Sequence, residues 1–105
     1  MGSFYGGRKG ESFIISKTFS TVTEMIEAFS QGGNYTEVLY GQYVMIQYQN
    51  HVNNGKVYKR GYEYQNDMGG AEYVGQICGP QGYIPHVDEE NETLYLLDIL
   101  TDEDI

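Results

Sequence analysis

Hydrophobic and polar positions predict a strand and a helix at the start of the chain. Residues 12–19 are mostly β-branched or aromatic, which is typical of a strand. Thr21 and Glu24 have the spacing of a capping box, which satisfies unpaired backbone N–H groups at a helix start. We expect the helix to run to about residue 31, because Gly32-Gly33 follows and glycine accepts the left-handed conformation beyond a helix end. Its apolar positions form one stripe, made by Val22, Met25, Ile26 and Phe29.

A β-hairpin is predicted around the Asn54-Gly55 pair. Both residues tolerate the positive φ that a tight hairpin turn requires. The flanking runs, residues 43–48 and 62–65, are rich in the aromatic and β-branched residues that suit a pleated surface. We therefore interpret the segment 53–61 between them as the turn region.

The remaining segments complete a small sheet. Residues 34–41 connect the helix to the hairpin and have room for a short strand. Residues 66–70 are a loop signal. Residues 71–78 are typical of a last strand, in which Gly75 marks either a bulge or a close backbone approach. Since a helix on a small sheet must bury its apolar stripe, we predict an α+β fold, with a small, mainly antiparallel β-sheet, one packed helix and extended termini.

Composition divides the chain into three regions. Residues 1–12 form a Gly-rich N-terminal arm, without the spacing of a phosphate loop or a dinucleotide fingerprint. Residues 13–80 form the compact β-rich domain. Residues 81–105 form an extended Gly/Pro exit and an acidic C-terminal tail. The tail contains an apolar run, compatible with a helix or strand docked on a neighbour and with a solvated, disordered segment.

The charge balance restricts the partners. Fifteen acidic and six basic residues give a formal net charge of −9, which argues against nucleic acid and against an anionic membrane surface. No apolar run is long enough to span a bilayer, and the N-terminus lacks the apolar core of a signal peptide. Eleven tyrosines and fourteen glycines indicate short strands and turns. The tyrosines are either ordinary for a small β-rich domain or part of a surface that binds other chains.

The polar residues predict no catalytic, cofactor or metal site. His51 and His86 lack the spacing of metal ligands, and Cys78 is the one cysteine that could join them. Cys78 ends an apolar strand, where cysteine usually packs as a small buried hydrophobe rather than acting as a nucleophile. We therefore expect a protein that is not an enzyme.

Six short motifs follow one another between residues 4 and 77. Each motif alone is weak, whereas their order and spacing make the set more specific. The motifs are Phe4-Tyr5-Gly6-Gly7-Arg8, Gln31-Gly32-Gly33-Asn34-Tyr35-Thr36, Gly41-Gln42-Tyr43-Val44, Asn54-Gly55-Lys56-Val57-Tyr58-Lys59-Arg60-Gly61, Asn66-Asp67-Met68-Gly69-Gly70-Ala71 and Tyr73-Val74-Gly75-Gln76-Ile77.

In this order the motifs resemble a domain of tail and baseplate structural proteins in phages and prophages of Gram-positive bacteria. The resemblance covers about residues 4–86. It implies a virion protein of the tail, made in the host cytoplasm, with no enzyme activity and no cofactor. In such relatives a Gly-Pro-rich segment is followed by longer fibre or receptor-binding regions. Here an acidic tail follows soon after residue 86, which fits an attachment or adaptor protein better than a receptor-binding one.

We therefore predict a structural protein that binds other tail or baseplate proteins and forms a homo-oligomer. The rotational symmetry of tails favours a trimer or a higher ring. The alternative is a small acidic phage-encoded inhibitor that mimics nucleic acid or blocks a host protein. The net charge supports the alternative. The position of about half of the acidic residues in one tail, rather than over a folded face, counts against it. The expected contact residues are Phe4, Tyr5 and Arg8 in the arm and Leu94, Tyr95, Leu96 and Leu97 in the tail.

Overall fold

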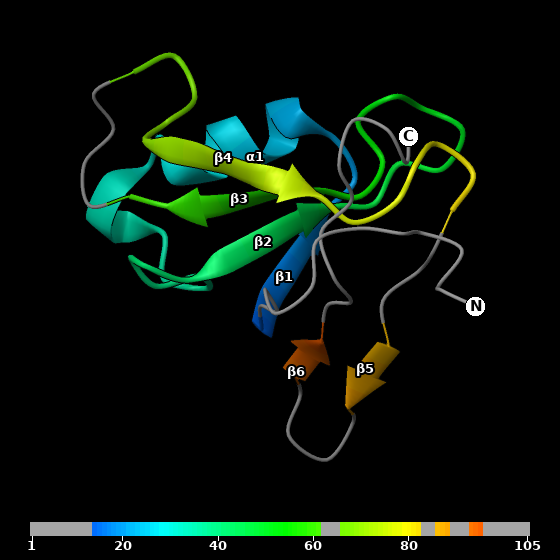
Figure 1. Ribbon diagram of the computed structural model, residues 1–105. Coiled ribbons are helices and arrows are strands. Elements are labelled where there is room, and N and C mark those ends of the chain that lie inside the picture. The colour runs from blue at the N-terminus through cyan, green and yellow to red at the C-terminus, as the bar shows by residue number, and fades with distance from the viewer. Residues whose placement is uncertain (1–13, 62–65, 83–85, 89–92, 96–105) are drawn as a thin grey trace.

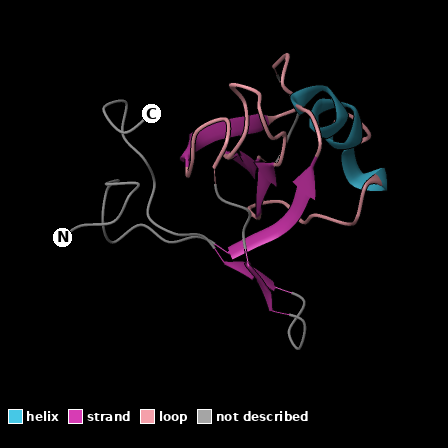
Figure 2. Cartoon of the chain, turned by 90° about the vertical axis from the view of Figure 1, so that its right-hand side faces the viewer, coloured by secondary structure: helices cyan, strands magenta, loops and turns pink. Residues whose placement is uncertain are grey.

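One sheet organises the molecule. The computed structural model of the 105-residue chain describes residues 14–61 and 66–82, and residues 86–88 and 93–95 through their backbone. Six strands form the sheet in the order β4-β3-β2-β1-β6-β5 (Figure 1). A view turned by 90° shows helix α1 standing over one face of the sheet (Figure 2). The predicted α+β fold with one packed helix is confirmed.

The first half of the sheet is a β-α-β unit. Strand β1 (Ile14–Phe19) leads into helix α1 (Val22–Phe29), and the chain returns through the 3₁₀ turn η1 (Gly32–Asn34) to strand β2 (Tyr43–Ile46). β1 and β2 are parallel neighbours, so the helix lies in the long crossover that parallel strands require. The short strand considered for residues 34–41 is absent from this described segment.

The helix begins where the sequence predicts. The Thr21 hydroxyl oxygen accepts a hydrogen bond from the backbone N–H of Glu24 at 3.1 Å. The helix ends two residues earlier than expected, at Phe29. Gly32 follows with φ of 61° and turns the chain away. The stripe is confirmed, because Met25 and Phe29 are buried and Val22 and Ile26 pack against the same core.

The second half of the sheet is an antiparallel meander. Strand β3 (Lys56–Arg60) pairs with β2 on one side and with β4 (Ala71–Gln76) on the other. β2 and β3 form a hairpin in the predicted region, but the predicted second strand, residues 62–65, lies outside the described residues. A β-turn is present at Asn54-Gly55, where the N–H of Lys56 donates to the Asn53 carbonyl at 3.1 Å and Gly55 has a φ of 82°, but this turn does not by itself connect the two strands. The connection is the whole loop 47–55, and β3 begins directly after Gly55, inside the segment interpreted as the turn.

The register of β3 and β4 shifts between Val57 and Tyr58, opposite Val74. The bulge expected near Gly75 is thus present at the neighbouring residue.

Two short strands follow in the region predicted as exit and tail. β6 (Thr93–Tyr95) pairs antiparallel with β1, and β5 (His86–Asp88) pairs antiparallel with β6. The backbone of this part of the apolar run is therefore a strand on the chain's own sheet. A strand was one of the conformations considered above for this run, but it pairs with β1 of the same chain rather than with another subunit.

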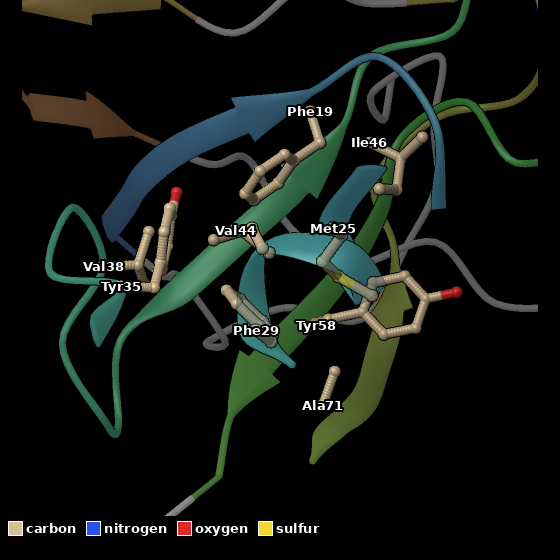
Figure 3. Packing of buried hydrophobic residues seen from close by; sticks show 10 residues of the cluster. Phe19, Met25, Phe29, Tyr35, Val38, Val44, Ile46, Tyr58 and Ala71 are labelled. Atoms are coloured by element: carbon tan, nitrogen blue, oxygen red, sulfur yellow. The ribbon is translucent and has the colours of Figure 1, made fainter. Parts of the chain in front are cut away.

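The sheet is apolar on both faces. On the helix side, aromatic rings meet aliphatic side chains, and Phe19 and Phe29 are T-shaped with centroids 5.9 Å apart. On the other side lies a smaller cluster, made by Ile15, Met45, Val57, Ile77 and Cys78. The burial of Cys78 is confirmed. The cluster on the helix side contains Phe19, Met25, Ala28, Phe29, Tyr35, Val38, Val44, Ile46, Tyr58 and Ala71 (Figure 3).

Candidate partner-binding surface

The loop 47–55, between β2 and β3, presents an aromatic pair and an aliphatic side chain. The rings of Tyr48 and His51 are stacked, with centroids 4.1 Å apart and planes 3° from parallel. Tyr48 is 39% exposed, and Val52 beside the pair is 67% exposed. We call these three residues, Tyr48, His51 and Val52, the loop surface.

Hydrogen bonds inside the loop fix the aromatic pair. The backbone N–H of Asn53 donates to Nδ1 of His51 at 3.0 Å, and the N–H of His51 donates to the carbonyl of Tyr48 at 3.1 Å. Because Nδ1 is an acceptor in this bond, the neutral ring carries its proton on Nε2. The imidazole therefore has a defined orientation against the Tyr48 ring.

The buried side-chain amide of Asn54 holds the loop against the segment that follows β4. Asn54 is 2% exposed. Its Oδ1 accepts from the backbone N–H of Tyr48 at 2.9 Å, and its Nδ2 donates to the Gly79 carbonyl at 2.9 Å and lies 3.4 Å from Sγ of Cys78. One side chain thus joins the start of the loop to the segment that follows β4. Buried polar networks in which each group is bonded make a structure more rigid.

A second buried amide comes from β4. Nε2 of Gln76 donates to the carbonyls of Val52 and Asn54, at 3.0 and 2.8 Å. The loop also takes a positive φ of 70° at Asn50, whose N–H donates to the Pro80 carbonyl at 2.6 Å. These contacts hold the loop against residues 76–82, which lie beside it in Figure 1.

A second group of exposed apolar side chains lies at the other end of β2. Leu39 is 60% exposed and Tyr40 is 38% exposed. The N–H of Leu39 donates to Oε1 of Gln42 at 2.8 Å, and the N–H of Gln42 donates to the Leu39 carbonyl at 3.1 Å. These reciprocal bonds close the turn that carries the two side chains.

The turn is held by a buried arginine on β3. Arg60 is 2% exposed, and its guanidinium donates to the carbonyls of Gly32, Tyr35 and Val38 at 2.7, 2.8 and 2.5 Å. The ring of Tyr40 lies 4.3 Å from its central carbon, within range of a cation–π contact. The connector between α1 and β2 is therefore held in place by hydrogen bonds from three of its carbonyls to the buried guanidinium of Arg60.

The Tyr35 ring lies beside this arginine, with its centroid 5.4 Å from the guanidinium carbon, and carries a hydroxyl group. This hydroxyl is buried and has no hydrogen-bond partner among the described residues. Burial raises the pKa of Tyr35, the nearby Glu37 carboxylate raises it further, and Arg60 lowers it. Burial also raises the pKa of Tyr58, with a contribution from Tyr73. Both rings are consequently favoured in the neutral form.

The contact residues predicted from the sequence are placed only in part. Leu94 and Tyr95 belong to β6, with their backbones opposite Ile15 and Ile14 of β1. Their side chains lie outside the description, as do the remaining predicted contact residues, Phe4, Tyr5, Arg8, Leu96 and Leu97.

The loop surface was not among the sequence predictions. Its signal was present, because Asn54-Gly55 marks the loop and Gln76 is a polar residue at the end of an apolar strand. What the pattern lacked were the long-range contacts of these side chains, from Asn54 to the Gly79 carbonyl and from Gln76 to the carbonyls of Val52 and Asn54.

The described part of the chain offers no group of three His, Cys, Asp or Glu residues that could hold a metal ion. In the same residues, no helix is long and apolar enough to cross a bilayer. Comparisons with protein-family models, with curated proteins and with solved structures return no match to this chain. The functional interpretation therefore depends on the chain's own geometry and on the motif resemblance.

Proposed function

We propose that the chain is a non-enzymatic structural protein of a phage virion, a tail or baseplate adaptor that binds other proteins through the loop surface. The observation that carries this proposal is the combination of exposure and rigidity in the loop. Tyr48 and Val52 are exposed on the loop, while the buried side chains of Asn54 and Gln76 fix its backbone by hydrogen bonds.

A fixed loop favours binding for an entropic reason. Ordering a flexible segment costs free energy at the moment of association, and a loop that is already ordered avoids that cost. Tyrosine adds a large contact area with few rotatable bonds. The stacking of Tyr48 on His51 restricts this ring before a partner arrives. An exposed aromatic on a rigid loop is thus suited to be an interface anchor.

The phage setting rests on the motif resemblance. Residues that shape the two exposed groups belong to those motifs. Asn54 and Arg60 both lie in the motif 54–61, and Gly32 and Tyr35, whose carbonyls bind Arg60, lie in the motif 31–36. The resemblance therefore concerns the framework that presents the candidate contacts.

The positions of the two exposed groups support assembly into a ring. Leu39 and Tyr40 precede β2, and the loop surface follows it, so the groups lie at opposite ends of one strand. A subunit with different contact groups at its two ends favours head-to-tail association, and such contacts form a ring when the rotation closes. This agrees with the trimer or higher ring that the resemblance implies.

Light scattering after size-exclusion chromatography tests the proposal. The full chain is measured alone and mixed with purified tail and baseplate proteins encoded beside its gene. We expect a defined complex or a closed oligomer, and at least about tenfold weaker association for the double variant Tyr48→Ser, Val52→Ser. Gln49→Ser, at an exposed position in the same loop, is the matched control and should behave like the wild type.

A chain that stays monomeric and without a partner in every mixture would refute the proposal. It would also favour the alternative of an acidic inhibitor, which pull-downs against host nucleases and repressors would then examine.

A further inference from the structure

Asn54-Gly55 is the one Asn-Gly pair in the sequence, and such pairs are chemically labile. Asparagine is a thermolabile residue, and a following glycine leaves its side-chain carbonyl carbon open to attack by the next backbone nitrogen. We infer that Asn54 is a deamidation site. The folded loop protects it from reaction, and unfolding exposes it. This inference does not depend on the proposed function.

The reaction needs only water. The backbone nitrogen of Gly55 loses its proton to solvent base and forms a bond with Cγ of Asn54. The bond from Cγ to Nδ2 breaks, and the amide nitrogen leaves as ammonia after taking up a proton. Water then opens the cyclic imide at one of its two carbonyls. Opening at one carbonyl gives an aspartate, and opening at the other gives an isoaspartyl link, in which the main chain runs through the former side chain.

The folded loop opposes each requirement of this reaction. The attacking N–H of Gly55 donates to the Ile46 carbonyl at 2.7 Å. The Asn54 amide is bonded at both ends, to the N–H of Tyr48 and to the carbonyl of Gly79, each at 2.9 Å. Asn54 is 2% exposed, so solvent base and water are excluded. Rotation of the Asn54 amide into a position where the Gly55 nitrogen can attack it would break these bonds inside the protein, where unpaired polar groups are costly.

The products do not fit the folded site. A carboxylate only accepts hydrogen bonds, so the oxygen that replaces Nδ2 would face the Gly79 carbonyl, 2.9 Å away in the present structure. The N–H of Tyr48 would still donate to the other oxygen, but a buried carboxylate without an opposite charge and with one oxygen facing a carbonyl is strongly unfavourable. The isoaspartyl link instead lengthens the main chain beside Gly55, whose N–H binds Ile46 and whose carbonyl accepts from Ile77 at 2.9 Å.

The consequence is a one-way step. Once an unfolded molecule has reacted at Asn54, it cannot rebuild the amide network that fixes the loop. Unfolding thereby becomes irreversible by chemical modification of the unfolded state.

Peptide mapping by mass spectrometry tests the inference on the full chain. Samples are held at mildly alkaline pH in buffer and in urea above the unfolding midpoint. We expect Asn54 to react at least about 100-fold more slowly in buffer, since the loop must open first. Asn50 and Asn66, which no glycine follows, are internal controls and should stay largely intact in both samples. Refolding yield after dilution should fall in proportion to conversion at Asn54.

Variants on β4 separate loop opening from the intrinsic chemistry. Gln76→Ala removes two bonds to the loop and should raise the rate in buffer by about tenfold. Glu72→Ala, exposed on the same strand, should leave the rate unchanged. If Gln76→Ala does not fold, urea below the midpoint serves instead and should raise the wild-type rate steadily. Equal rates in buffer and urea, or a deamidated chain that refolds with an unchanged midpoint, would overturn the inference.

Discussion

Replacing Arg60 by methionine should be among the most destabilising single changes in the domain. Methionine has a similar length and keeps the apolar stem of the side chain. It removes the three hydrogen bonds to the carbonyls of Gly32, Tyr35 and Val38 and the contact with the Tyr40 ring. The connector between α1 and β2 then loses the group around which it is arranged.

The magnitude follows from two opposing contributions. Hydrogen bonds to a charged group contribute about 1.5–3 kcal/mol each, so three such bonds amount to about 5–9 kcal/mol before any offset. Removing a desolvated charge returns several kcal/mol of this. We therefore expect Arg60→Met to lower the free energy of unfolding by about 3–4 kcal/mol, against a total of about 5–15 kcal/mol for a domain of this size.

Urea unfolding followed by tyrosine fluorescence and far-UV circular dichroism measures this loss. The chain has no tryptophan and eleven tyrosines, so tyrosine is the available intrinsic fluorophore. We expect the midpoint for Arg60→Met to fall by about 1.5 M or more. Arg60→Lys should fall between it and the wild type, because an ammonium keeps the charge but lacks the planar fork of donors.

Lys59→Met, at the neighbouring and partly exposed position on β3, is the matched control and should change stability by no more than about 0.5 kcal/mol. Equal midpoints for Arg60→Met and Lys59→Met would refute the reasoning.

Three further predictions concern single positions. Thr21→Ala should cost about 1 kcal/mol through loss of the helix cap, whereas Thr23→Ala on the exposed helix face should not destabilise, by the same urea titration. Gly55→Ala should cost at least about 2 kcal/mol more than Gly41→Ala. Both glycines have positive φ, but only at Gly55 would the new Cβ meet Cys78, with its Sγ 2.7 Å away, so equal costs would contradict the packing. Tyr35→Phe should keep or raise stability by up to about 1 kcal/mol, because it removes a buried hydroxyl without a described partner. Its stability should also fall less steeply above pH 10, where the raised pKa of Tyr35 makes the unfolded state lose its proton first.

The local elements were predictable because short-range signals specify them. Thr21 and Glu24 mark the helix start, Gly32 marks its end, and the β-branched run before Phe19 marks the first strand. The loop at residues 66–70 was equally clear, and there Oδ1 of Asn66 accepts from the N–H groups of Met68 and Gly70. Such contacts join residues close in sequence, so the local order of residues alone indicates them.

The loop surface and the arginine site depend on contacts between distant residues. Asn54 was interpreted as half of a tight turn, yet its side chain bonds to Gly79, twenty-five positions away. Arg60 is charged, and charged residues are rarely fully buried, so no local pattern indicates that it lies in the core. The carbonyls that it binds belong to the connector, where no strand forms and whose shape therefore had no periodic signal.

The most direct test of the account is to map where a bound tail partner contacts the chain. In NMR spectra of the labelled full chain, titrated with a purified tail or baseplate protein that binds it, the Val52 methyl groups and the rings of Tyr48 and His51 should show the largest changes. Thr23, on the exposed side of α1, should be unaffected. A complex that forms while the signals of Tyr48, His51 and Val52 stay unchanged would contradict the account.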